Sequence, residues 1–541
     1  MLNNFELNLH INFLKKAILI KEFLEKHIVA ILAIILSGIS GFYFIHYLQN
    51  GLGLNYNDAR SHLDIGRRVV EGLKPGLAQL GSVWLPLNHI LMIPLVWNDW
   101  AWHSGFAGAF WNMLSFVGTG LIIYKILEKL KVGTIGRIMG VIVFAANLNI
   151  LYLQSTAMTE PLLLFTMTTG CYYLILWSED QTILNLIKSS FWIMLSTLVR
   201  YDGWFLLLFA TMIVGITTWI KRGYKVAEGL TVLFLTMGAL GIVLWFGWNA
   251  AIFKDPLYFA LGPFSAHAQQ QQLLQAGNLP TMHNIVLSTQ LYFYSIFYNC
   301  VVFIAVLGLI GAIAVWFDKK LKGEMRFATI SLLSPLAFNI LALYLGFSVL
   351  FVQGISGNTW FNIRYGIMML PAFAVFLGYL VDKLKDLRWV IIGLYIFTMF
   401  FAFANGDAVT IDDARVGSSQ KNVTQVSGYL NKVAENQKGF ILISAASHDA
   451  IIFSSGLPMS RFIHEGTGAY WTDALKEPDR WARWIVMRTY DESDLTYKSV
   501  SKAPGFKKYH LVDCYPFADV YEIDSQYLNQ LNYTPVLGKQ K

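Results

Sequence analysis

Acidic, basic and imidazole side chains occur together just after the first long apolar run of the sequence. The segment YNDARSHLDIGRRVVEGL contains Asp58, Arg60 and His62. Asp58 and His62 are four residues apart, so on a helix they share one face. A carboxylate beside a histidine and an arginine is suited to take a proton from a hydroxyl group. The segment is therefore a candidate catalytic site, while a helix-capping role for Asp58 is the structural alternative.

Other charged residues stand at the ends of later apolar runs. Glu160 begins one run, Arg200 and Asp202 lie between two others, and Arg364 with Tyr365 opens a fourth. Charged groups near hydrocarbon are costly and usually pair with each other or line a cavity. We therefore expect these residues, distant in sequence, to meet at one membrane face. Each also has a simpler interpretation. Glu160 could only favour a helix dipole, Arg200 and Asp202 could form an ion pair that fixes a turn, and Arg364 could be an interfacial anchor.

Two further residues are candidates for contact with a ligand. His89, in WLPLNHILMIPL, could contact a sugar, and Lys254, in FKDPLYF, could meet a phosphate or only solvent. The three cysteines lie far apart and show neither metal-ligand nor disulfide spacing. No cofactor is required by these patterns, and a divalent cation held by acidic residues stays an open alternative.

The composition indicates that a membrane positions these residues. The chain has 541 residues, of which 55% are hydrophobic and 14% charged, whereas average globular chains are about 25% charged. A membrane-spanning helix needs roughly 20 mostly apolar residues. Eleven stretches qualify, and the first reads as a retained signal anchor. Their limits are 28–48, 103–124, 136–153, 160–177, 183–200, 203–220, 228–249, 285–316, 327–351, 365–382 and 388–405.

Two apolar stretches depart from a simple span. The eighth, 285–316, is long enough to tilt or to contain a break. Residues 85–97 are apolar but short and contain two prolines, which predicts an interfacial or re-entrant segment. Before it, the sequence from Asp58 predicts an amphipathic helix that is capped by Asn57 or Asp58 and has Ala59 and Leu63 on its apolar side.

Lysines and arginines predict the orientation of the chain. They gather in alternate loops, for example between residues 125 and 137 and between 319 and 326. The positive-inside rule places those loops in the cytoplasm. We therefore expect a cytoplasmic N-terminus (1–27), a transmembrane module (28–405, with a first outer loop at 49–102) and an extracytoplasmic domain (406–541) of a multi-pass cell-membrane protein.

The C-terminal part changes character after the last span. Charges become frequent, and strand-length apolar runs at 439–446 and 484–488 alternate with helix-like stretches at 422–435 and 471–483. This alternation predicts a small soluble α/β domain. The predicted fold is therefore a polytopic α-helical membrane protein with about eleven spans and a C-terminal α/β domain.

The segment around Asp58, followed by WLPLNHILMIPL, resembles the first extracytoplasmic loop of the C-type (GT-C) glycosyltransferases. The most similar group comprises the dolichyl-phosphate-mannose–protein mannosyltransferases and the lipid A aminoarabinose transferases (glycosyltransferase family 39-like). The resemblance extends over roughly residues 28–405. In that family an Asp near the start of this loop is essential and is proposed as the catalytic base, and the matching position is Asp58. The mannosyltransferases carry an Asp-Glu pair there, whereas Asp58 here stands between Asn57 and Ala59.

The resemblance implies an inverting hexosyl- or pentosyltransferase of the cell envelope that uses a polyprenyl-phosphate-linked sugar. Asp58 would deprotonate an acceptor hydroxyl, and Arg364, with Arg200 or Lys254, would neutralise the leaving phosphate. Glycan, lipid and protein acceptors are all open, membrane lipids surround the spans, and no nucleic-acid partner is expected. The alternatives are a transporter or flippase, which would need ionisable residues at mid-membrane, and a membrane scaffold whose outer domain binds a partner.

Overall fold

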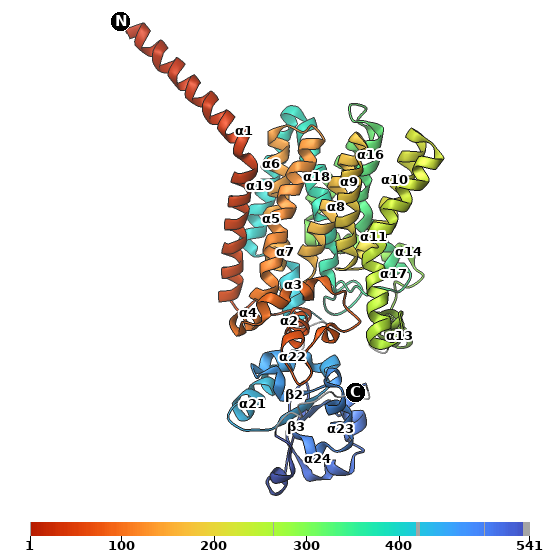
Figure 1. The fold of residues 1–541 in the computed structure, drawn as a ribbon. Coiled ribbons are helices and arrows are strands. Elements are labelled where there is room, and N and C mark those ends of the chain that lie inside the picture. Colours follow the sequence, from red (N-terminus) through yellow and green to blue (C-terminus); the bar gives the residue numbers. More distant parts are fainter. Residues whose placement is uncertain (1, 263–264, 418–421, 492, 534–541) are drawn as a thin grey trace.

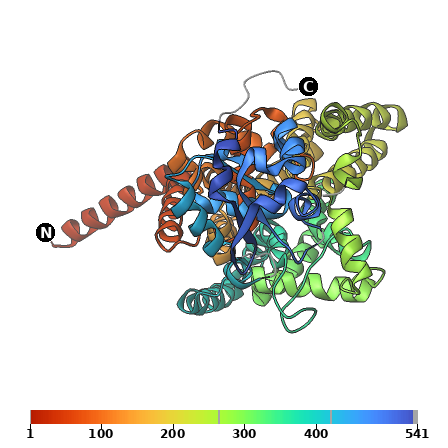
Figure 2. The same cartoon turned by 90° about the horizontal axis from the view of Figure 1, so that it is seen from below.

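The computed structural model describes residues 2–262, 265–417, 422–491 and 493–533. A bundle of long, roughly parallel helices forms one part, and a small α/β domain lies against one end of it (Figure 1). Seen along the bundle, the strands and helices of that domain lie over the helical part (Figure 2). The helices α2 (Asn57–Val70) and α3 (Leu87–Val96) lie between the two parts.

Eight helical segments among the described residues are long and apolar enough to cross a membrane. The protein is therefore an integral membrane protein. Five of them belong to the helices α1 (Leu2–Gln49), α5 (Phe106–Lys129), α8 (Glu160–Asp180), α10 (Asp202–Arg222) and α11 (Tyr224–Phe253). The other three combine shorter elements and cover Gly323–Tyr344 (α16, Gly323–Thr329; α17, Ser334–Tyr344), Ile363–Lys383 (η3, Ile363–Met369; α18, Leu370–Lys383) and Lys385–Val416 (α19, Arg388–Asn405; α20, Val409–Val416).

All eleven apolar stretches of the sequence contain helices, but several of them are not single long helices. The eighth is broken into α14 (Ile285–Cys300) and α15 (Val302–Phe317), which are bent by 109°. The break falls at Val301, whose φ of +66° is unusual for a branched side chain. The helices α6 (Thr134–Ala145) and α9 (Ile183–Thr197) have only 12 and 15 residues, so each is shorter than a full span.

The helix expected after the first span is present, but its N-terminus differs from the prediction. The N-cap residue is Tyr56, and it makes no side-chain capping hydrogen bond. Asn57 and Asp58 are already inside the helix, so neither caps it. Ala59 and Leu63 are buried, as the apolar pattern predicts. Asp58 is therefore free to point away from the helix end toward the bundle.

The remaining short helices connect these elements. The apolar stretch 85–97 contains α3, a short apolar helix that contacts α2. The other connecting helices are α4 (Asp99–His103), α7 (Leu148–Leu153), α12 (Tyr258–Leu261) and α13 (Ala266–Gln275).

The C-terminal domain is an α/β unit with one mixed sheet in the order β2-β1-β3-β5-β4. The strand β1 is parallel to β2 and β3, whereas β5 is antiparallel to β3 and β4. All four residues of β1 are buried, so helices cover the sheet on both faces there. The elements are α21 (Thr424–Ala434), β1 (Phe440–Ile443), α22 (Ala445–Ser455), β2 (Phe462–Ile463), α23 (Ala469–Lys476), α24 (Pro478–Trp481), β3 (Ala482–Met487), α25 (Leu495–Val500), β4 (Tyr509–Cys514) and β5 (Asp519–Ile523).

The soluble domain is held to the bundle through α2 and the segment that follows it. Arg68 on α2 lies 3.9 Å from Asp449 on α22. The Phe453 ring of α22 lies 5.8 Å from the ring of Trp102. These contacts place the soluble domain directly beside the helix that carries Asp58.

Candidate functional site

Arg364 is the centre of a buried ionic cluster at the end of the bundle near α2. Each nitrogen of its guanidinium faces a different carboxylate. Nη2 lies 2.6 Å from Asp58, Nε lies 3.0 Å from Glu160, and Nη1 lies 3.7 Å from Asp413. The side chains of Glu160 and Asp413 are fully buried, whereas that of Asp58 is 30% exposed. Asp58 is therefore the carboxylate that a molecule outside the cluster can reach.

The backbone around Arg364 is fixed by α14. Ser295 Oγ and Asn299 Nδ2 both donate hydrogen bonds to the Ile363 carbonyl, at 2.7 and 2.6 Å. A Cβ atom at Gly366 would lie 2.2 Å from the Ser295 carbonyl oxygen. Only glycine allows this close approach. The contact clamps η3 onto α14 and sets the direction in which Arg364 points.

Glu160 joins Arg364 to a second arginine. Its Oε1 atom also lies 3.4 Å from Arg200 Nη1, and Arg200 Nε lies 3.3 Å from Asp202. The Arg200 guanidinium stacks over the ring of Tyr365 at 4.7 Å. Glu160 and Asp202 are the first residues of α8 and α10, where acids are favoured by the helix dipole. The result is a chain of alternating charges that spans several helices.

Asp413 and Tyr56 complete the cluster, and neither was among the site residues predicted from the sequence. Tyr56 donates a hydrogen bond of 2.9 Å to Asp413, and its ring lies 5.0 Å from the Arg364 guanidinium carbon. Burial raises the pKa of Tyr56 well above its ordinary value, so the hydroxyl stays protonated as a donor. Asp413 lies on α20, between the last long helix and the soluble domain. The only signal for it was its charge near the end of a span.

His62 and His89 form a neutral pair beside the cluster. Nδ1 of His62 lies 2.8 Å from Nε2 of His89, and the ring of Trp84 lies 4.5 Å from that of His62. Burial, with the positive charges of Arg364 and Arg200 acting in the same direction, lowers the pKa of His62 to about 3. Burial also holds the pKa of His89 well below its usual range. Because neither ring is protonated, one nitrogen of the close pair donates and the other accepts.

Two of the expected residues have other contacts. Arg60, on the same helix as Asp58, donates from Nε to the Leu54 carbonyl at 2.7 Å. Lys254 is exposed and donates to the carbonyl of Ala251, three residues earlier. Within the part of the chain that the structure describes, no group of three or more His, Cys, Asp or Glu side chains is arranged to hold a metal ion.

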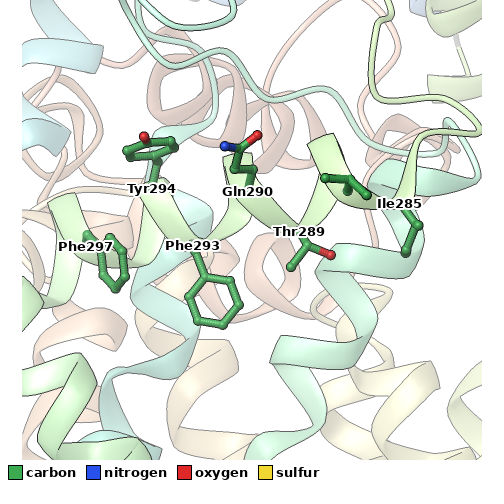
Figure 3. A pocket seen from close by; sticks show the side chains of 7 residues that line it. Ile285, Thr289, Gln290, Phe293, Tyr294 and Phe297 are labelled. Carbon is green, nitrogen blue, oxygen red and sulfur yellow. The ribbon is translucent and has the colours of Figure 1, made fainter.

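An apolar groove runs along the face of α14 that points away from η3. It has a volume of about 630 Å³. Figure 3 shows its side chains projecting from this one helix, with Phe293 and Phe297 among them. Its lining residues are Ile285, Val286, Thr289, Gln290, Phe293, Tyr294 and Phe297. The same helix therefore presents an apolar groove on one face and holds the Arg364 segment with another.

No family model and no curated protein sequence matches this chain. The structure is similar to that of ArnT from Cupriavidus metallidurans bound to undecaprenyl phosphate. The TM-score is 0.54 at 11% sequence identity, over 90% of this chain and 98% of ArnT. It is also similar to the oligosaccharyltransferase AglB from Archaeoglobus fulgidus in complex with an inhibitory peptide and a dolichol-phosphate (TM-score 0.48, 11% identity, 90% and 73% coverage).

The similarity to ArnT defines the class of the fold. The chain has the GT-C fold, a polytopic helical module with a C-terminal soluble domain, and it shares this fold with ArnT over nearly the whole of both chains. The resemblance that the segment around Asp58 carries is thereby confirmed at the level of the fold.

Proposed function

We propose that this protein is an inverting glycosyltransferase that moves a sugar from a polyprenyl-phosphate donor to an acceptor hydroxyl at the outer membrane surface. The observation that carries the proposal is the pair of Asp58 and Arg364. A partly exposed carboxylate touches a buried guanidinium, and together they offer a base for the acceptor next to a cation for the leaving phosphate. The chain shares the GT-C fold with ArnT, whose structure was solved with bound undecaprenyl phosphate. This similarity supports a polyprenyl-phosphate-linked sugar as the donor.

The chemistry follows from the two charges. Asp58 takes the proton of the acceptor hydroxyl as its oxygen attacks the anomeric carbon, and the bond between that carbon and the phosphate oxygen breaks on the opposite face. The phosphate leaves with the bonding electrons, and its charge is neutralised by Arg364 with help from Arg200. General-base assistance typically contributes about 10²–10⁴-fold. Stabilising the developing charge is often the largest single contribution to catalysis.

The groove on α14 is where we place the isoprenoid chain of the donor. Its lining is apolar and aromatic, as expected of a surface that holds a hydrocarbon chain. The helix that bears it also hydrogen-bonds to the backbone of Ile363, next to Arg364. In this arrangement the isoprenoid lies on one face of α14, and the phosphate reaches past the helix to Arg364 on its other face.

The orientation we propose places the ionic cluster and the soluble domain outside the cytoplasm. The opposite end of the bundle carries lysine-containing ion pairs, among them Lys383 with Asp318 and Lys221 with Glu324. Cationic residues favour cytoplasmic loops. The site would then face the side on which lipid-linked sugars of the cell envelope are consumed.

The test is direct measurement of transfer chemistry. Purified protein is incubated with a panel of polyprenyl-phosphate sugars and candidate acceptors, and released polyprenyl phosphate is identified by mass spectrometry. We expect release with at least one donor, dependent on an acceptor hydroxyl. Substrate-coupled flux across liposomes without release of polyprenyl phosphate would instead support a transporter or flippase.

A further inference from the structure

We infer that Asp413 is a positioning residue that acts through Arg364 and sets how tightly this arginine binds the phosphate of the polyprenyl lipid. The inference rests on the proposed function, in which Arg364 meets that phosphate. Asp413 itself touches neither the sugar nor the attacking oxygen in this account. Asp413 partly offsets the positive charge of Arg364 and helps to orient its guanidinium, which binds the phosphate.

The geometry separates the roles of the three carboxylates. Nη2 donates a hydrogen bond to Asp58 and Nε donates one to Glu160, whereas Asp413 lies 3.7 Å from Nη1 as an ion-pair partner, so a carboxylate stands beside each of the three nitrogens. A guanidinium that is held in this way cannot turn about its long side chain. Because Asp58 and Asp413 face different Nη atoms, Asp413 keeps the arginine in place when Asp58 is engaged with the acceptor.

Charge singles out Asp413 among the three. Glu160 divides its negative charge between Arg364 and Arg200. Asp58 gives up its negative charge when it takes the acceptor proton. Asp413 has one cationic partner, Arg364, and accepts a hydrogen bond from the neutral hydroxyl of Tyr56. Its negative charge therefore acts on Arg364 through the whole reaction, and a nearby carboxylate opposes the binding of an anionic phosphate.

The position of Asp413 in the chain gives this contact a second consequence. The helix α20 joins the last long helix to the soluble domain. It is tied to the bundle by Thr410, whose amide and hydroxyl both bond to Asn149 Oδ1, at 3.0 and 2.9 Å. Arg364 is thus held by a residue from the connection to the soluble domain.

Weaker binding of phosphate by Arg364 favours release of the product, polyprenyl phosphate. Polyprenyl phosphate is released after each turnover, and a buried arginine with one carboxylate fewer beside it would hold this product more tightly. With Asp413 in place, Arg364 binds the donor and still lets the product go. Removing the charge of Asp413 should therefore tighten product binding and slow turnover.

The main experiment compares Asp413→Asn, Asp413→Glu and Asp412→Asn in the full-length protein. Asp412 is the exposed neighbour of Asp413 and serves as the matched control. Binding of undecaprenyl phosphate is measured directly, together with kcat and KM for donor turnover. We expect Asp413→Asn to bind undecaprenyl phosphate about tenfold more tightly, the size of a modest change in charge interaction. Its kcat and KM should both fall, while Asp413→Glu stays near wild type and Asp412→Asn is unchanged.

A second variant tests the inference in the opposite direction. Tyr56→Phe keeps the ring beneath Arg364 but removes the donor that shares the charge of Asp413. Without this hydrogen bond, the negative charge of Asp413 interacts more strongly with Arg364. Undecaprenyl phosphate should therefore bind a few-fold more weakly. If Asp413→Asn does not fold, this variant decides the question.

The outcomes separate the inference from the proposed function. If the wild type binds undecaprenyl phosphate, Arg364→Gln does not, and both Asp413→Asn and Tyr56→Phe bind like wild type, Asp413 has only a structural role and the inference is wrong. If the wild type does not bind any polyprenyl phosphate, the proposed function itself fails. A lower melting temperature for Asp413→Asn with unchanged affinity also counts against the inference.

Discussion

Oδ2 of Asp58 lies 2.6 Å from Nη2 of Arg364, although 306 residues separate them in the sequence. The candidate base is thus an ion-pair partner of the candidate phosphate-binding group. A donor phosphate that takes up Nη2 would release Asp58 toward the acceptor. The contact therefore links binding of the donor to the release of Asp58 as a base, and we expect the donor to bind first.

Asp58→Asn should abolish most transfer and leave the protein folded. The amide keeps the shape of the side chain but cannot take a proton, so we expect kcat to fall about 10²–10⁴-fold. The variant is assayed with a radiolabelled lipid-linked sugar, and folding is checked by thermal unfolding in detergent. Full turnover by this variant would remove Asp58 from the mechanism.

Asp64 provides a matched control on the same helix and a prediction of its own. It is fully buried, and burial raises its pKa well above its ordinary value, with Arg68 acting in the opposite direction. A raised folded-state pKa makes folding less favourable as pH rises above the unfolded value of about 3.9. Asp64→Asn removes that cost. We therefore expect the variant to keep its turnover and to melt at a higher temperature at pH 7, with the difference disappearing near pH 3.

A lower melting temperature for Asp64→Asn at pH 7 would contradict this assignment. It would mean that the carboxylate is charged in the folded protein and that Arg68 stabilises it. Measuring Asp58→Asn and Asp64→Asn over the same pH series separates a catalytic carboxylate from a buried structural one on a single helix.

Hydropathy predicted where the site residues lie along the membrane normal, but it did not predict which residues they contact. Glu160, Arg200 and Arg364 could be selected because a charge at the end of an apolar run must find a partner. Lys254 satisfied the same criterion, yet it is exposed and bonds to its own helix. Position along the membrane normal is encoded in the length of apolar runs. Which helix faces which is decided by side-chain packing, such as that of α14 on η3.

The residues that the sequence did not reveal lie where local patterns change. Asp413 follows the last span predicted from the sequence, 388–405, in a stretch whose charged composition suggested only the start of a soluble domain. Its partners Tyr56 and Arg364 come from distant segments, so no spacing rule connects them. The capping prediction for Asp58 failed for the same reason. A distant arginine offered a stronger contact than the helix end.

Glu160→Gln should leave both Arg364 and Arg200 without a carboxylate partner that they share. Glu160 is fully buried and contacts Arg364 at 3.0 Å and Arg200 at 3.4 Å. Removing one partner of a buried ion pair typically costs about 3–5 kcal/mol because a charge is left uncompensated. We expect a lower melting temperature and weaker binding of undecaprenyl phosphate. The matched change Glu128→Gln, in an exposed ion pair with Lys125, should alter neither.

The groove on α14 predicts a dependence on lipid length. Thr289→Trp places a large ring among the lining residues. We expect it to raise KM for an undecaprenyl-phosphate donor and to leave a donor with a short isoprenoid nearly unaffected, because only the long chain occupies the groove. Leu208→Trp, at an exposed position on α10, is the control. Equal effects of Thr289→Trp on long and short donors would exclude the groove as the lipid site.

The interface between α22 and the segment after α2 predicts how far the soluble domain supports the site. The Phe453 ring is buried 5.8 Å from the rings of Trp102 and His103, and its replacement by alanine typically costs about 3–5 kcal/mol. Because α22 also contacts α2, Phe453→Ala should increase hydrogen exchange of α2 amides and lower kcat. Leu511→Ala, at an exposed position on β4, is the control for a general loss of domain stability. Unchanged exchange in α2 together with normal turnover would show that the catalytic helix is held by the bundle alone.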